Sequence, residues 1–191
     1  QNHAAPVSQN GQLHANNLLG DTLFAVVRYN ADGSPDDGSA NDSTPSDRFG
    51  TNGKVTTLYG NDPLGSRSFG NSVAIQSNGR IVVAGTTYDH AFSSPSLLVV
   101  RYNVDGSLDD GKAGDSTHGD KFGNNGTVTW SNSSANSVVI EPYDGRIVAT
   151  GVALTGSNNG FATVRYNVDG SLDDGSITDS TPGDSFGTDG T

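Results

Sequence analysis

Short apolar runs alternate with turn-forming residues along most of the chain, and the same order of runs occurs twice. Each run holds four to eight residues rich in Val, Ile and Thr and is bounded by Gly, Asn, Asp or Ser. Runs of this length and composition predict β-strands. The first series occupies residues 54–58, 72–76, 80–87 and 97–103, and the second occupies residues 127–130, 137–142, 146–153 and 161–167.

Two dipeptides predict the turns between neighbouring strands. Asn78-Gly79 and Asp144-Gly145 stand between the second and third runs of their series, and tight hairpins need residues that tolerate φ > 0. The run at 97–103 is apolar on both faces, which indicates a strand covered on both sides. Four short strands per repeat are typical of a propeller blade. We expect an all-β fold of propeller-blade-like or stacked antiparallel β repeats, with two full units, a partial one and almost no helix.

A segment rich in Asp and Gly follows the last run of each series, and a third copy lies nearer the N-terminus. We call residues 28–50, 101–123 and 165–187 the first, second and third acidic loops. All three begin with Arg-Tyr-Asn, end with Phe-Gly and have the same length, so the spacing of their aspartates is preserved. The repeats divide the chain into an N-terminal arm, residues 1–20, and a single β domain, residues 21–191. The domain comprises a partial unit at 21–53, a unit at 54–126 and a unit at 127–191 that lacks its last strand.

The motifs RYNVDGSLD, FG-x-x-G and NGRIVVAG recur in this order and resemble the delta-60 repeat family of bacterial secreted and surface proteins. The resemblance covers nearly everything from Phe24 to Gly190. It implies a propeller-like β array and no catalytic residues. The chain departs from the family pattern by an acidic insertion of the type DGSxxxDSTxxD between the LD and FG motifs, which the resemblance does not explain.

The acidic loops gather the oxygen ligands that calcium prefers. Calcium takes roughly six to eight oxygens in a flexible shell, and Asp, Asn, Ser and backbone carbonyls interleaved with glycine can supply them. Five carboxylates per loop also repel one another, and a bound cation would offset that repulsion. We therefore predict Ca²⁺ in each loop. The candidate ligands are Asn30, Asp32, Asp36, Asp37, Asp42, Asp47, Asn103, Asp105, Asp109, Asp110, Asp115, Asp120, Asn167, Asp169, Asp173, Asp174, Asp179 and Asp184.

The loops do not follow the EF-hand pattern. If Asp105-Gly106 takes the fifth and sixth positions, Arg101 and Lys112 fall at the first and twelfth, where calcium needs carboxylates. A metal-free alternative stays open beside calcium: the loops can be solvated turns closed by aspartate side chains. In that alternative Arg28, Arg101 and Arg165 pair with nearby aspartates.

Charge and composition narrow the class of protein. The formal net charge is −11, from twenty Asp and one Glu against ten Lys and Arg, which argues against a nucleic-acid partner. Cysteine is absent, so disulfides and thiolate metal sites are excluded. No apolar run reaches the length of a transmembrane helix. A chain that starts at Gln1 and contains no Met reads as a processed or partial chain, so we expect an extracellular or cell-surface location.

No catalytic constellation stands out, and we expect no enzyme. The sequence lacks the nucleophile motif G-x-S-x-G, and its four histidines do not recur in the repeat. We expect an extracellular structural or adhesive protein, stabilised by calcium and assembled head to tail into a filament or surface layer. In that assembly, residues 4–13 of the arm would add a strand to the incomplete last unit of the next subunit.

Two other functions stay open. The first alternative is a calcium-dependent carbohydrate- or ligand-binding module, for which Tyr59, Tyr88 and Phe92 are the aromatics in non-repeated loops. The other is an accessory fragment of a secreted hydrolase, which would require a non-repeated acid/base pair in a pocket.

Overall fold

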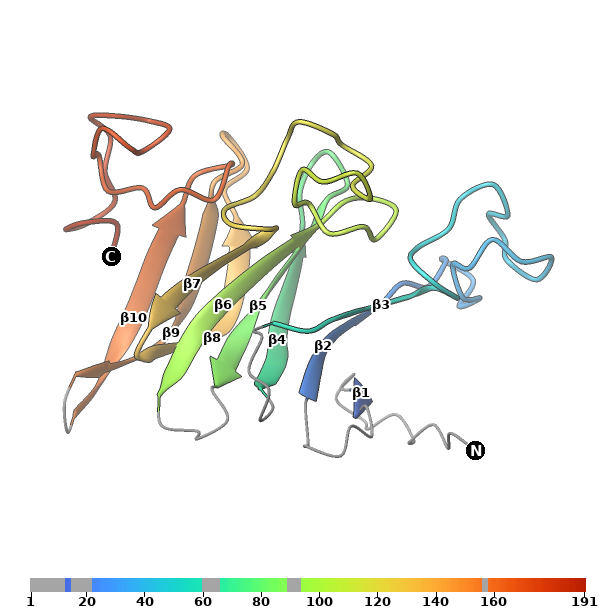
Figure 1. Ribbon diagram of the computed structural model, residues 1–191, viewed down its shortest axis with the longest axis horizontal. Helices are drawn as coiled ribbons and strands as arrows, with labels where there is room; N and C mark the ends of the chain where they lie inside the picture. The colour runs from blue at the N-terminus through green and yellow to red at the C-terminus, as the bar shows by residue number, and fades with distance from the viewer. Residues whose placement is uncertain (1–12, 15–21, 60–65, 89–93, 156–157) are drawn as a thin grey trace.

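The computed structural model describes residues 13–14, 22–59, 66–88, 94–155 and 158–191, and within these residues the fold is all-β, as predicted. No helix in these segments is long and apolar enough to cross a membrane. Figure 1 shows the strands side by side with long loops at their ends. The strands are β1 (Leu13–His14), β2 (Thr22–Val27), β3 (Lys54–Thr57), β4 (Arg67–Ile75), β5 (Ile81–Tyr88), β6 (Pro95–Tyr102), β7 (Thr127–Ser131), β8 (Ser133–Ile140), β9 (Ile147–Thr155) and β10 (Asn158–Tyr166).

Strands β4, β5, β6 and β7 form one four-stranded antiparallel blade. The predicted hairpin at Asn78-Gly79 joins β4 to β5, but only Gly79 has a positive φ, +84°. The amide of Gly79 donates to the carbonyl of Gln76, and the strands meet at the pair Ile75–Ile81. The connection is therefore longer than a two-residue turn. The predicted strand at 97–103 is covered on both faces, because Leu97, Leu98, Val99 and Val100 are all 0% exposed.

Strands β8, β9 and β10 repeat the first three strands of that blade. Even the irregularity of register recurs, between Gly70 and Ser72 in β4 and between Ala135 and Ser137 in β8. The first two acidic loops each separate a strand from its edge partner: β3 pairs with β2 across the first loop, and β7 pairs with β6 across the second. Among the described residues, β10 pairs with β9 alone.

The hydrophobic core forms two clusters, one on each side of the blade β4–β7. One cluster joins this blade to β8, β9 and β10 and includes Val99, Phe122 and Val164. The other joins it to β2 and β3 and includes Phe24 and Phe49. Both clusters contain the phenylalanine that ends an acidic loop, so the loops are anchored in the interfaces between repeats.

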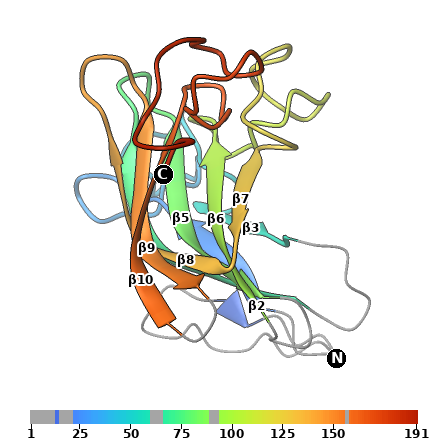
Figure 2. The same cartoon turned by 90° about the vertical axis from the view of Figure 1, so that its left-hand side faces the viewer.

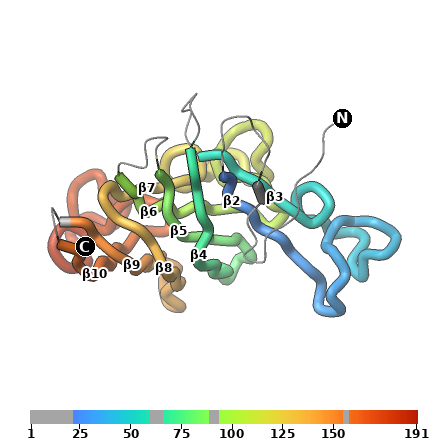
Figure 3. The backbone as a smooth tube through the Cα atoms, turned by 90° about the horizontal axis from the view of Figure 1, so that it is seen from below, coloured from blue at the N-terminus to red at the C-terminus, as the bar shows by residue number. Residues whose placement is uncertain are grey.

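The three acidic loops follow one another along the long axis of the molecule, with the first loop (blue to cyan) at one end and the third (red) at the other (Figure 1). Figure 2 shows the second and third loops at the same end of the strands. In the view from below, the first loop projects beyond β2 and β3 (Figure 3). The arm at residues 4–13, predicted to donate a strand, lies outside the described residues except for Leu13. Leu13 pairs with Leu23 in the same chain.

Candidate functional site: the acidic loops

Each acidic loop is closed at its base by its first arginine. In the second loop, Arg101 Nε donates to Asp109 Oδ2 at 2.5 Å, and both side chains are almost fully buried. The guanidinium also lies over the ring of Phe122, 4.8 Å from its centroid. The same contacts recur in the other loops, from Arg28 to Asp36 and Phe49 and from Arg165 to Asp173 and Phe186. The arginine therefore holds together the start, the middle and the end of its loop.

A second aspartate is the hydrogen-bonding centre of the loop; we call Asp42, Asp115 and Asp179 the hub aspartates. Asp115 Oδ1 accepts from the amide and hydroxyl of Thr117 and from the side-chain amide of Asn103, while Oδ2 accepts from the amide of Gly111. The other two hubs have equivalent donors. Four donors at equivalent positions, from three separate parts of the loop, thus converge on each of these carboxylates.

The donors of the hub lower its pKa. Burial alone would raise the pKa of Asp42, but the amides of Thr44 and Gly38, the side chain of Asn30 and the Thr44 hydroxyl lower it to about 2. The pKa values of Asp115 and Asp179 are lowered in the same way, against the opposing effect of burial. A hydrogen bond to the charged form favours that form, so the hubs stay ionised well below neutral pH.

Two further aspartates in each loop close short turns. Asp105 Oδ1 accepts from the amide and hydroxyl of Ser107, and Asp110 Oδ1 accepts from the amide of Lys112. The equivalent positions in the other loops, Asp32 and Asp37, and Asp169 and Asp174, make the same turns. Aspartate favours such turns because its side chain can bond the backbone two residues on.

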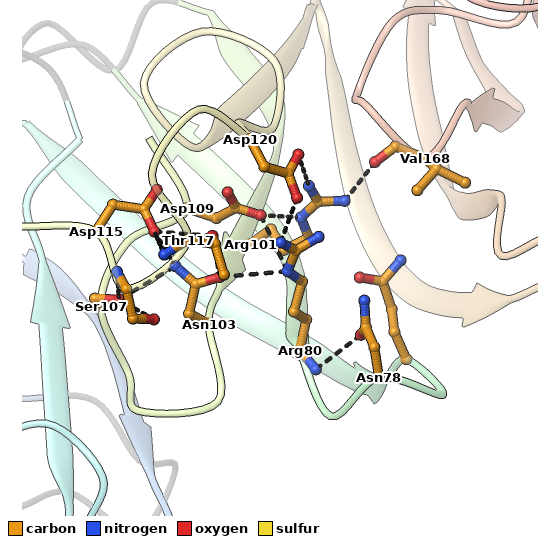
Figure 4. A network of polar contacts seen from close by, with 12 residues as sticks. Asn78, Arg80, Arg101, Asn103, Ser107, Asp109, Asp115, Thr117, Asp120 and Val168 are labelled. Atoms are coloured by element: carbon orange, nitrogen blue, oxygen red, sulfur yellow. Dashed lines mark hydrogen bonds and ion pairs between the residues drawn. The ribbon is translucent and has the colours of Figure 1, made fainter. Parts of the chain in front are cut away.

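Sequence reasoning missed two arginines that serve these loops. Arg80 contacts the carboxylates of Asp120 and Asp109 in the second loop, the latter at 3.6 Å, and Figure 4 shows it beside Arg101. Arg146 does the same in the third loop, 2.5 Å from Asp184 and 3.6 Å from Asp173. The signal was present in the sequence, because each arginine directly follows a repeated turn, in Asn-Gly-Arg and Asp-Gly-Arg.

The predicted calcium ligands do not converge on one point: some pair with arginines, some accept the hydrogen bonds of the hub, and others close turns. In the part of the chain that the structure describes, no three His, Asp or Glu side chains form a group that could hold a metal ion. Asp36, Asp109 and Asp173 each keep one buried oxygen, Oδ1, without a donor from the described residues. Arg101 and Arg80 both face the other oxygen of Asp109, and their two positive charges disfavour a cation there. Calcium in the loops stays a prediction from the sequence.

Consecutive loops are joined by a contact that occurs twice in the chain. The amide of Gly50 in the first loop donates to the carbonyl of Asp105 in the second at 2.7 Å, and the amide of Gly123 donates to the carbonyl of Asp169 in the third at 2.7 Å. Next to each of these two backbone hydrogen bonds, an arginine side chain makes a second hydrogen bond between the loops. Arg28 Nη1 donates to the carbonyl of Val104, and Arg101 Nη1 donates to that of Val168 (Figure 4).

A glycine makes this close approach possible. A Cβ on Gly106 would lie 2.9 Å from the ring of Phe49 and 2.9 Å from the amide nitrogen of Gly50. A Cβ on Gly170 would meet Phe122 at 2.9 Å and the amide nitrogen of Gly123 at 2.6 Å. Both glycines also have a positive φ, +84° and +86°. The motif Asp-Gly-Ser is therefore a docking element for the Phe-Gly end of the preceding loop.

The aromatics considered for carbohydrate binding have other neighbours. Tyr59 packs against the core cluster between β2, β3 and the central blade, and Tyr88 stacks edge to face on Phe69, with ring centroids 6.2 Å apart. Phe92 lies outside the described residues. A groove of about 770 Å³ runs along β7 and is lined by Tyr59, Leu108, Trp130 and Leu172, with Lys112 as the one charged residue in its lining.

A comparison with protein families finds a match in three separate segments. The family is described as a domain of unknown function (DUF5122), β-propeller, and it matches residues 15–38, 76–111 and 144–175. Every segment ends at the same position of an acidic loop, the glycine of Asp-Asp-Gly. The repeats are thus similar to a β-propeller repeat family, in agreement with the all-β blades. The matching family is a β-propeller family, and the comparison does not identify it with the delta-60 repeat family. Neither a curated protein nor a solved structure matches the chain.

Proposed function

We propose that the chain is a non-enzymatic structural module of an extracellular or surface protein, in which the acidic loops lock successive β repeats into one rigid array. The observation that carries this is the duplicated contact between loops: Gly50 to Asp105 and Gly123 to Asp169 have the same donor, acceptor and length. A repeated interface of this kind is what repeat proteins use to couple neighbouring units.

The contact gains its strength from burial as well as from hydrogen bonds. Phe49 and Phe122 are 0% exposed under the following loop, and burying a phenylalanine side chain stabilises by about 1.5–3 kcal/mol. Each backbone hydrogen bond adds about 1 kcal/mol. The hub and turn aspartates accept hydrogen bonds from donors of their own loop, and these bonds keep the loop ordered.

Substituting the docking glycine tests the proposed coupling. Gly106→Asn keeps a residue that tolerates a positive φ but places its Cβ against Phe49. We expect a loss of about 1–3 kcal/mol in the free energy of unfolding, as for other overpacked sites. Hydrogen exchange should speed up in the first loop as well as in the second.

The matched control is Gly119→Asn in the same loop, where φ is +88° and nothing lies within 4 Å of the added Cβ. It should leave exchange in the first loop unchanged. If both variants affect only the second loop, the repeats are not coupled through this contact, and the proposed function fails.

The groove along β7 favours a second candidate, a carbohydrate- or ligand-binding module. Its support is the side chain of Trp130, which is only partly buried at the groove, since sugars stack on such rings. Titration of Trp130 fluorescence with a panel of oligosaccharides tests it. Saturable quenching by one oligosaccharide, together with calorimetric binding of the same sugar that Trp130→Ala abolishes, would favour this candidate.

A further inference from the structure

The third acidic loop carries the donor half of the loop contact without an acceptor. Its Gly187 is exposed, and the amide bonds no acceptor among the described residues. Arg165 Nη1, which corresponds to the Arg101 atom that bonds Val168, faces Glu141 at 3.6 Å. Phe186 is partly exposed, whereas its two counterparts are fully buried.

The first acidic loop carries the acceptor half without a donor. Its Gly33 has the same φ as the docking glycines, +85°, yet nothing lies within 4 Å of an added Cβ. Gly33, Ala31 and Asp32 are exposed, and neither the carbonyl of Ala31 nor that of Asp32 accepts a hydrogen bond from the described residues. The two open halves are complementary because they are copies of the two halves that meet inside the chain.

We propose that a second copy of this chain docks its first acidic loop on the third, and so repeats the internal contact between molecules. Gly187 N would donate to the Asp32 carbonyl of the second copy, Arg165 to the Ala31 carbonyl, and Gly33 would lie against Phe186. Only backbone carbonyls are needed at the acceptor side, so Ala31 serves in place of Val104 and Val168. The proposal deepens the proposed function, on which it rests.

The placement of the loops suits this association. The first and third loops lie at opposite ends of the long axis (Figure 1), so one copy can use both faces at once. A contact between two different faces is heterologous, and it yields a ring if the rotation closes and a filament if it does not. It needs no strand from the N-terminal arm, which distinguishes it from the strand addition expected from the sequence.

A blocking substitution at Gly33 tests the interface. Gly33→Asn fits the free chain, because the site is open and asparagine tolerates its φ, but it would collide with Phe186 of the docked copy. We expect the wild-type chain, followed by sedimentation velocity over a concentration series, to shift from monomer to larger species. The G33N variant should stay monomeric, and its melting temperature should fall no further than that of the control below, because both substitutions place asparagine at a similar positive φ.

The matched control is Gly183→Asn, which has φ of +88° and open surroundings. Its counterpart in the doubly docked second loop, Gly119, is equally open, so this position lies outside the loop contact. G183N should associate like the wild type.

Mixing G33N with the wild type sharpens the test. G33N keeps the donor face and loses the acceptor face, so adding it to the wild-type chain should cap the assemblies and shift them to smaller species. A wild-type chain that stays monomeric throughout overturns the proposal, and so does a G33N variant that associates like the wild type. Neither result touches the proposed function, which the exchange experiment on Gly106 tests within a single molecule.

Discussion

The second and third acidic loops have almost the same sequence and different surroundings. The second loop receives Gly50 from the first and passes its own Gly123 to the third, whereas the third loop only receives. Phe122 is consequently 0% exposed and Phe186 is partly exposed. Inside each loop the hub, the turns and the arginine pairs are alike. The contacts inside a loop are therefore the same with or without a following loop, but its phenylalanine is fully buried only where a next loop covers it.

Replacing each of the two phenylalanines by alanine should show the difference between the two loops most strongly. Phe122→Ala leaves a cavity in a closed interface, and we expect it to cost about 3–5 kcal/mol in the free energy of unfolding. Phe186→Ala removes a partly exposed ring and should cost less, about 1–2 kcal/mol. Urea unfolding followed by the fluorescence of Trp130, the single tryptophan, measures both. Equal losses would mean that the next loop contributes nothing to burial.

Acid should destabilise the two loops to the same extent, because, among the described residues, the hub aspartate of each loop is bonded only by donors of that loop. The hub pKa values lie below the ordinary 3.8, for Asp42 at about 2. A carboxyl whose pKa is lowered by folding stabilises the fold fully above its unfolded pKa and loses that contribution as the pH falls through the folded one. We expect this contribution to be constant above about pH 5 and to disappear between about pH 4 and pH 2. Hydrogen exchange of each loop across this range measures it, and a loss in one loop alone would contradict the shared design.

Chelation should have the smallest effect. A calcium site saturated at about a hundred times its dissociation constant adds about 2.7 kcal/mol to the stability. Because the loop carboxylates already accept from protein donors, we expect a change below about 1 kcal/mol between calcium and a chelator. Thermal melts in the two buffers measure it, with magnesium as the control cation. A large shift specific to calcium would establish the ions predicted from the sequence.

The sequence predicted what depends on local pattern. The hairpin at Asn78-Gly79, the strand covered on both faces at β6 and the all-β class follow from periodicity and turn residues. The alternative of turns closed by aspartates, with Arg101 and its counterparts paired to them, also describes the observed hydrogen bonds. What spacing could not supply was the partner of each carboxylate, because Arg80 reaches Asp120 from 40 positions away along the chain. The docking role of Gly106 was likewise hidden, since a turn glycine and a contact glycine look the same in sequence.

The pairing of β6 with β7 across the second loop has a consequence for cleavage of the backbone. Lys112 lies exposed in that loop, within reach of a trypsin-like protease, while the strands on either side of the loop are hydrogen-bonded to each other from Ser96–Ser131 to Val100–Thr127. A cut after Lys112 would leave β6 and β7 paired in the same sheet, so we expect the two pieces to stay together as one folded particle and to separate only on denaturing gels.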